Sequence, residues 1–239
     1  MKVLGLDSSG LVASVAVAED DNLLAEYTVN YKKTHSQTLL PMLDQIVTMI
    51  ELDLNTIDAI AVAGGPGSFT GLRIGSATAK GLGFALGKPL IQIPTVDGLA
   101  YNLWGSSELV CPLMDARRNQ TYTGLYTFDH GVMQVVEPQC AVGIEEIIEK
   151  INHKNHTVVF LGDGVPVFRS FIEKNCRVPF SFAPAHLNKQ RAAAVASLGI
   201  LYFKEGKIQT AAQHRPDYLR LSQAERERMA QETSMTDRN

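Results

Sequence analysis

The sequence predicts an α/β protein built from two copies of one unit, in which three strands are followed by a helix, a strand and a second helix. Three observations support this prediction. An apolar run at residues 3–6 ends at Asp7, and a second apolar run at residues 109–114 ends at Asp115 in the same way. Each run precedes two further strand-like segments. Helical patterns then alternate with short apolar strands in both halves of the chain.

The elements of the first half follow from local patterns. Thr34 and Gln37 form a capping-box pattern that predicts the start of a helix, and Pro41 predicts a kink or a later start. Turn-forming residues at 19–22 predict a hairpin. The expected elements are strands at 3–6, 14–18 and 23–29, a helix after residue 34, a strand at 57–63, a helix at 70–86 capped by Gly87, a strand at 89–93 and a helix at 96–104.

The second half repeats this order. The expected elements are strands at 109–114, 121–128 and 132–136, a helix at 144–151, a strand at 158–161, and helices at 167–174 and 189–203. We therefore expect two similar subdomains, at 1–105 and 106–221, and a polar tail at 222–239. Tandem units of this kind are typical of the duplicated fold of actin, Hsp70 and sugar kinases.

Composition and charge limit the function classes. The net charge of -3 gives no basic surface of the kind that binds nucleic acid by itself, so a role with RNA would run through a partner. The 3 cysteines are far apart and lack metal-ligand spacing, which predicts reduced thiols in a cytosolic protein. No apolar stretch approaches the roughly 18 residues of a membrane span. We expect a soluble, cytoplasmic protein.

The turn at residues 7–10 is the first candidate for a nucleotide or anion site. Its hydroxyls and backbone N–H groups suit a phosphate in folds of this type. Ser9, however, stands where a phosphate-binding form of the turn has glycine, which lets the backbone approach the anion closely. A turn in which Asp7 and the serines bond their own backbone is an equally good interpretation.

The turn at residues 115–118 is the second candidate. Its two arginines suit bidentate binding of a phosphate or a carboxylate, and they equally suit an exposed basic turn or a salt bridge to a partner. If the halves are duplicates, this turn faces the first across a cleft. The combined prediction is a vestigial nucleotide or anion site formed by Asp7, Ser8, Ser9, Asp115 and Arg117.

The most informative stretch is residues 64–73, with the sequence Gly-Gly-Pro-Gly-Ser-Phe-Thr-Gly-Leu-Arg. The glycines allow a tight turn off a strand, and Ser68 or Thr70 can cap the helix that follows. A loop at a helix N-terminus favours an anion, but no lysine completes a P-loop here. The alternative is a plain connection between a strand and a helix.

Small residues recur at every fourth position of the helix after this loop, at Gly71, Gly75, Ala79 and Gly83. They stack into one ridge along the helix. Glycine inside a helix costs about 0.5–1 kcal/mol relative to alanine, so the ridge needs a compensating close contact. Packing within the chain and packing against a partner both supply one.

The histidines do not form a metal site by pattern. His35, next to a helix start, is more typical of a hydrogen-bonded structural residue than of a base or ligand. The sequence has no paired metal-ligand motif and no nucleophile elbow. We therefore predict no metal.

Five segments together resemble the TsaB (YeaZ) family. They are residues 6–9, 35–41, 64–73, 114–118 and 216–220, in the order that the family has them. The resemblance implies a non-enzymatic paralogue of TsaD, the subunit that transfers threonylcarbamoyl to the adenosine beside the anticodon of tRNAs reading codons that begin with A. TsaD-like enzymes bind a metal through an H-x-x-x-H pair, and the corresponding positions here are Thr95 and Leu99, which are not metal ligands.

The resemblance also implies partners. They are a TsaD-like catalytic subunit and a TsaE-like ATPase, with a homodimer in isolation and tRNA bound only through the complex. No cofactor is required, and weak ATP or ADP binding is expected at most, at the partner interface. A Gly75→Leu variant should then weaken the heterodimer and leave the monomer folded. The expected interface residues are Leu39, Leu43, Ile46, Gly71, Gly75 and Ala79.

Two other functions compete with this one. An active small-molecule kinase or ATPase of the same fold would use Asp7 and the turn at residues 162–164, but it needs a glycine in the first turn and a carboxylate poised as base. A metallopeptidase would need the paired histidines that the sequence lacks.

Overall fold

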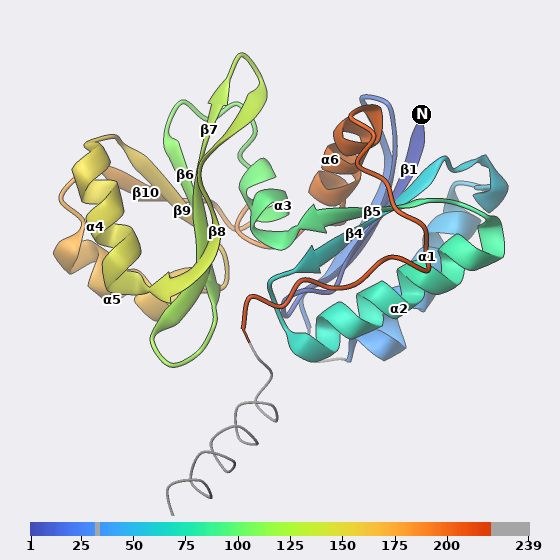
Figure 1. Ribbon diagram of the computed structural model, residues 1–239, viewed down its shortest axis with the longest axis horizontal. Helices are drawn as coiled ribbons and strands as arrows, with labels where there is room; N and C mark the ends of the chain where they lie inside the picture. Colours follow the sequence, from blue (N-terminus) through green and yellow to red (C-terminus); the bar gives the residue numbers. More distant parts are fainter. Residues whose placement is uncertain (32–33, 221–239) are drawn as a thin grey trace, which may run out of the picture.

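A computed structural model describes residues 1–31 and 34–220. It contains two five-stranded sheets with the orders β3-β2-β1-β4-β5 and β10-β9-β6-β7-β8. Written in reverse, the second order is β8-β7-β6-β9-β10. In each sheet, three antiparallel strands are followed by two strands parallel to the first strand of that half, so the two halves have the same topology. The predicted duplicated actin/Hsp70/sugar-kinase-like fold is confirmed (Figure 1).

The first sheet is buried on both faces, and this explains its continuous apolar strands. Its central strands β1 and β4 have almost no exposed residue. The strands are β1 (Lys2–Asp7), β2 (Ala13–Glu19), β3 (Asn22–Val29), β4 (Ala59–Gly65) and β5 (Leu90–Pro94).

Two helices cover the outer face of the first sheet, α1 (His35–Met49) and α2 (Phe69–Leu86), and a short 3-10 helix, η1 (Leu54–Thr56), precedes β4. They lie side by side in Figure 1 and contact one another. Ser68 caps α2 through a bond from the Gly71 N–H to its hydroxyl, as predicted. Gly87 ends α2 in the left-handed conformation, with φ of 65°, which also agrees with the prediction.

The second half has the same plan. Two helices, α4 and α5, cover the outer face of its sheet with a row of buried isoleucine, valine and phenylalanine side chains. The elements are β6 (Leu109–Asp115), β7 (Gln120–Asp129), β8 (Val132–Gly143), α4 (Ile144–Lys154), β9 (Val158–Leu161), α5 (Val165–Asn175) and β10 (Phe180–Phe182).

The last helix of each half packs between the two sheets. Helix α3 (Thr95–Tyr101) contributes to the core that covers the inner face of the second sheet. Helix α6 (Ala192–Lys204) covers the inner face of the first sheet and also contacts α3 (Figure 1). The second subdomain that we expected at 106–221 therefore keeps its sheet, α4 and α5, whereas α6 packs with the first sheet.

Several local expectations need correction. Thr34 stands at the start of α1 but makes no side-chain capping bond, and Pro41 lies inside a helix that already begins at His35. Strand β8 runs to Gly143 because it pairs with β7 along its whole length. Helix α6 begins three residues later than predicted, and β10 was not predicted, since three residues leave too little pattern to detect. The expected tail at 222–239 lies outside the described residues.

Candidate functional site between the two halves

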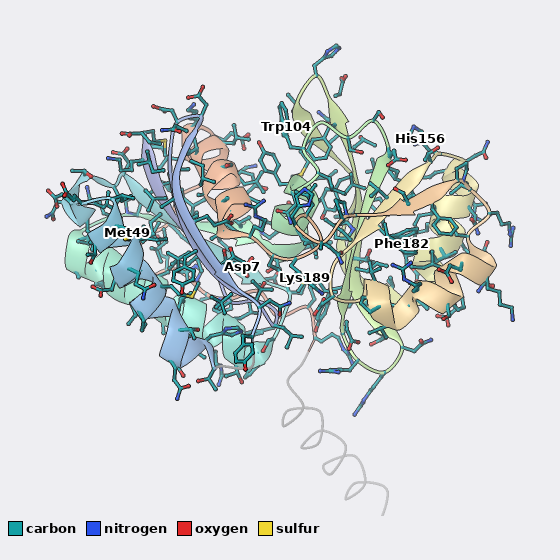
Figure 2. All side chains as sticks on the ribbon, turned by 180° about the vertical axis from the view of Figure 1, so that it is seen from behind. Asp7, Met49, Trp104, His156, Phe182 and Lys189 are labelled. Carbon is teal, nitrogen blue, oxygen red and sulfur yellow. The ribbon has the colours of Figure 1, made fainter. Side chains whose placement is uncertain are left out.

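A cleft with a volume of ≈ 700 Å³ lies between the halves. Turns from both halves line it, so Ser9 comes together with Asp115 and Arg117. Asp163, which follows β9, lies on the same wall as Asp115. Asp7 and Ser8 are buried beneath the first turn and do not line the cleft. In Figure 2, Asp7 lies toward the middle of the molecule.

The carboxylate of Asp7 is occupied by its own turn. Its Oδ1 accepts hydrogen bonds from the Ser9 N–H at 2.9 Å and from the Ser9 hydroxyl at 2.6 Å. Burial raises the pKa of Asp7 to about 6, although the two bonds from Ser9 oppose the rise. The turn therefore has the self-bonded form, in which the carboxylate and hydroxyl satisfy each other.

The glycine-rich loop packs directly against this turn. The Ser68 N–H, at the N-terminus of α2, donates to the Ser9 carbonyl at 2.7 Å. A Cβ on Gly67 would overlap that same carbonyl, and a Cβ on Gly71 would overlap the carbonyl of Ser8. The glycines thus allow two backbone segments to touch. The chain's own carbonyl occupies the Ser68 N–H that an anion would need.

The small-residue ridge of α2 also faces inward. The Ser8 hydroxyl donates to the Gly71 carbonyl at 2.9 Å, and a Cβ on Gly75 would lie only 2.5 Å from the Ser8 oxygen. Ala79 is fully buried in the core under the sheet. Of the two explanations for the ridge, the structure supports packing within the chain.

All six residues that we expected at or near the partner interface are buried within the chain. A Gly75→Leu variant would clash with the turn below it and damage the fold rather than a surface. The buried residues are Leu39, Leu43, Ile46, Gly71, Gly75 and Ala79.

The outward surface of α1 and α2 carries different residues. Leu40, Met49 and Phe84 are exposed apolar side chains, with Met49 and Phe84 exposed by 83% and 64%. Figure 2 shows Met49 at the outer edge of the first half. Helix α2 also exposes a second row of small residues at every fourth position, at Ala77, Gly81 and Ala85. This row is visible in the sequence, but it has the same four-residue period as the ridge at 71–83. The pattern therefore does not show which of the two rows faces outward.

A segment near the end of the described chain forms one wall of the cleft. The Asp217 N–H donates to the Gly64 carbonyl at 2.6 Å, and the Asp217 carbonyl lies where a Cβ on Gly65 would stand. The ring of Tyr218 packs on Phe69 with centroids 4.7 Å apart. Residues 216–220 therefore cover the glycine-rich loop, a role that was not predicted, since only the family resemblance had singled them out.

The segment then reaches the second half. Arg220 donates from Nη1 to the Ala116 carbonyl, within the turn that follows β6. In this turn, the Asp115 carboxylate accepts from the Arg117 N–H at 2.8 Å and pairs with the Arg117 guanidinium at 3.2 Å. Burial raises the pKa of Asp163 nearby. The cleft thus presents a carboxylate wall and an arginine at its rim.

The described residues contain no group of three or more histidine, cysteine or acidic side chains placed to hold a metal ion. His35 bonds to the Gly10 carbonyl at 2.8 Å, which is the structural role that we expected for it. Thr95 and Leu99 are buried on α3, and the Thr95 hydroxyl accepts from the Gly65 N–H. Among the described helices, none is both long and apolar enough to cross a membrane.

Comparison with known proteins agrees with these observations. Residues 22–228 match the family model described as TsaD, tRNA N6-adenosine threonylcarbamoyltransferase. The chain is 32% identical to the tRNA threonylcarbamoyladenosine biosynthesis protein TsaB of Bacillus subtilis (strain 168), over 94% of this chain and 96% of that protein. The corresponding Escherichia coli (strain K12) protein is 27% identical, over 92% of this chain and 95% of that protein.

A solved structure with the same fold is YeaZ from Pseudomonas aeruginosa, with 27% identity and a TM-score of 0.78. The match covers 91% of this chain and 99% of YeaZ, so both halves and the cleft between them are included. Because the TsaD model matches most of the chain and the Bacillus relative matches nearly all of it, the chain belongs to the TsaB (YeaZ) family.

Proposed function

We propose that this chain is a non-catalytic subunit required for N6-threonylcarbamoylation of the adenosine beside the anticodon, in tRNAs that read codons beginning with A. It would act in the cytoplasm with a TsaD-like catalytic subunit and a TsaE-like ATPase, and tRNA would be bound only by the complex. The names of its relatives place them in tRNA threonylcarbamoyladenosine biosynthesis. The observation that carries the non-catalytic part is the contact between the Ser68 N–H and the Ser9 carbonyl.

This contact matters because it uses the Ser68 N–H, at the N-terminus of α2, that a bound phosphate would need. The backbone carbonyls of Ser8 and Ser9 lie against the glycine-rich loop, and the Asp7 carboxylate is bonded to Ser9. An ATPase needs N–H groups and an available carboxylate there. The Ser9 N–H, the Ser68 N–H and the Asp7 carboxylate are each used in bonds within the chain.

An active small-molecule kinase or ATPase is the second candidate. The cleft favours it, because Asp115 and Asp163 lie on one wall of a cavity of ≈ 700 Å³. A weakly bound ATP or ADP would fit this volume without turnover. The two candidates differ in whether the purified chain hydrolyses ATP by itself.

For the partner surface, we propose the outward side of α1 and α2 in place of the buried residues. Leu40 of α1 and Phe84 of α2 are exposed, and α2 also exposes the small residues Ala77 and Gly81, which allow another helix to approach closely. The occupant would be a helix pair of the TsaD-like subunit, or a second copy of this chain when that subunit is absent.

The deciding experiment is threonylcarbamoyl transfer to tRNA in a reconstituted mixture of the other components, with and without this chain. Product that forms only when the chain is present, together with no ATP turnover by the chain alone, is the expected result. Equal product in its absence would refute the proposal. Robust ATP turnover without any partner would favour the kinase.

The surface is tested separately by Phe84→Asp, with Val167→Asp as a matched control. Both side chains are exposed and lie on helices, at 64% and 58%, but Val167 is on α5 of the second half. We expect Phe84→Asp to weaken binding of the TsaD-like subunit at least tenfold in calorimetry and Val167→Asp to leave it unchanged. Equal binding by the two variants would remove this surface from the proposal.

A further inference from the structure

The turn between β6 and β7 has an unusual backbone. Arg117, Arg118 and Asn119 have φ angles of 65°, 56° and 59°, so three successive residues are left-handed and none is glycine. No other non-glycine residue with positive φ in the described part of the chain has a non-glycine neighbour in the same conformation. Arginine is a poor choice for such a conformation, in which glycine or asparagine is accommodated more easily. The two arginines therefore call for a reason other than the turn itself.

The turn is nevertheless held firmly. The Gln120 N–H donates to the Arg117 carbonyl at 3.2 Å, and the Ala116 N–H donates to the Gln120 carbonyl at 2.9 Å. The Asn119 side chain donates to Glu145 of α4 at 2.8 Å. These bonds fix both the base and the tip of the turn. The backbone that carries the two arginines is thus held in a defined conformation before any ligand arrives.

The guanidinium groups of the turn remain accessible. The side chain of Arg117 is 83% exposed even though it pairs with Asp115, whose own side chain is only 18% exposed. Arg118 is exposed, and its side chain makes no hydrogen bond or ion pair with the other described residues. Arg220 lies at the base of the turn through its bond to Ala116. Arg117 and Arg220 therefore line the cleft, and Arg118 follows Arg117 in the same turn.

Of the two guanidinium groups of the turn, the nearby carboxylates leave only that of Arg118 without an ion pair among the described residues. Asp115 holds Arg117 from one side, Glu145 is bonded to Asn119, and Asp217 accepts from Gln139 at 3.4 Å. The turn projects from the end of the second sheet, where a large ligand can reach it (Figure 1). Two accessible guanidinium groups on a turn whose backbone is held in place are suited to phosphate oxygens.

We infer that the Arg117–Arg118 turn binds the sugar–phosphate backbone of the tRNA while the catalytic subunit holds that tRNA. This rests on the proposed function, because the chain has a net charge of -3 and lacks the charge to retain RNA alone. A local contact of two arginines adds affinity to an RNA that is already bound. It carries no sequence preference, since phosphates are the same in every tRNA.

The test uses the complex of the full chain with its TsaD-like subunit and a fluorescent, unmodified transcript of a tRNA that reads a codon beginning with A. The dissociation constant is measured by anisotropy over a series of salt concentrations. The variant is Arg117→Ala/Arg118→Ala. The matched control is Arg169→Ala/Arg177→Ala, which removes the same charge from exposed positions elsewhere on the second half.

We expect the turn variant to weaken tRNA binding about tenfold at 0.1 M salt. The slope of log Kd against log salt should fall by about 1 to 2, since up to two phosphate contacts are lost. The control should keep the wild-type slope. Arg117→Lys/Arg118→Lys should keep most of the slope, because it retains the charge and loses only the planar fork.

Two results would overturn the inference. One is the same affinity and slope for the turn variant and its control. The other is weaker binding of the TsaD-like subunit with an unchanged salt slope for tRNA, which would mean that the arginines pair with carboxylates of a partner. Circular dichroism establishes that the variants are folded. Product formation by the wild-type chain, measured in parallel, reports on the proposed function independently of the turn.

Discussion

The Tyr126 hydroxyl donates a 2.7 Å hydrogen bond to the Asp97 carboxylate, and this bond joins α3 of the first half to β7 of the second. Both residues are buried, with 0% and 7% of their surfaces exposed. Tyr202 of α6 donates to the other oxygen of Asp97 at 3.3 Å. Burial raises the pKa of Asp97, so its charged form depends on these two donors.

Tyr126→Phe should therefore destabilise the protein by about 1–3 kcal/mol, because it leaves one oxygen of a buried carboxylate without a donor. Tyr202→Phe is the matched control and should cost less, since its bond is longer and its side chain is partly exposed. Urea denaturation measures both. Equal losses in the two variants would contradict this reading of the network.

Asp7 predicts a pH dependence of stability. Its pKa is raised to about 6 in the folded protein from an ordinary value of 3.8. The folded state therefore holds the proton more tightly than the unfolded state, and stability is highest below about pH 4 and falls as pH rises to about 6. A rise of this size corresponds to about 3 kcal/mol.

An Asp7→Asn variant should be more stable than wild type at pH 7 by up to about 3 kcal/mol, with the difference vanishing near pH 4. The amide oxygen can still accept from Ser9. The difference between the two proteins isolates Asp7, because Asp97 and Asp163 contribute equally to both. A difference that stays constant between pH 4 and 7 would show that Asp7 does not titrate as described.

Two glycines of α2 should respond in opposite directions to alanine. Gly71→Ala places a Cβ against the Ser8 carbonyl and should cost about 2–4 kcal/mol, since a backbone segment must move. Gly81 has nothing within 4 Å of its Cβ position, so Gly81→Ala should stabilise the protein by about 0.5–1 kcal/mol. Thermal or urea unfolding compares them. Similar effects at both positions would mean that the ridge does not face inward.

Arg118→Gly should raise stability while it removes a proposed tRNA contact. Its φ of 56° is strained for arginine and open to glycine. The gain should be about 0.5–1 kcal/mol after the larger entropy of glycine in the unfolded chain is deducted. Urea denaturation gives the value, with Arg169→Gly on α5 as the control that should be destabilised because it places glycine inside a helix.

Most of the fold could be predicted from sequence because its signals are local. Strand β9 was predicted at residues 158–161, as observed, and the Gly87 cap followed from the residue that ends α2. The position of α6 was not predictable in this way. Its apolar residues require burial but do not specify which sheet supplies it, and it packs on the first sheet although it follows the second in the chain.

The candidate site also has features that local sequence patterns predict and features that depend on tertiary packing. The sequence by itself determined that Asp7 and Asp115 end equivalent strands and that their turns face one cleft, since a duplicated unit repeats its geometry. Only the tertiary structure decided which side of α2 is buried. The row of small residues that contains Gly75 and the row that contains Gly81 have the same spacing and similar residues. Ser8 packs against the first row and bonds to Gly71, which lies 63 residues later in the chain, so this row is the buried one. Such a long-range contact leaves no local pattern to read.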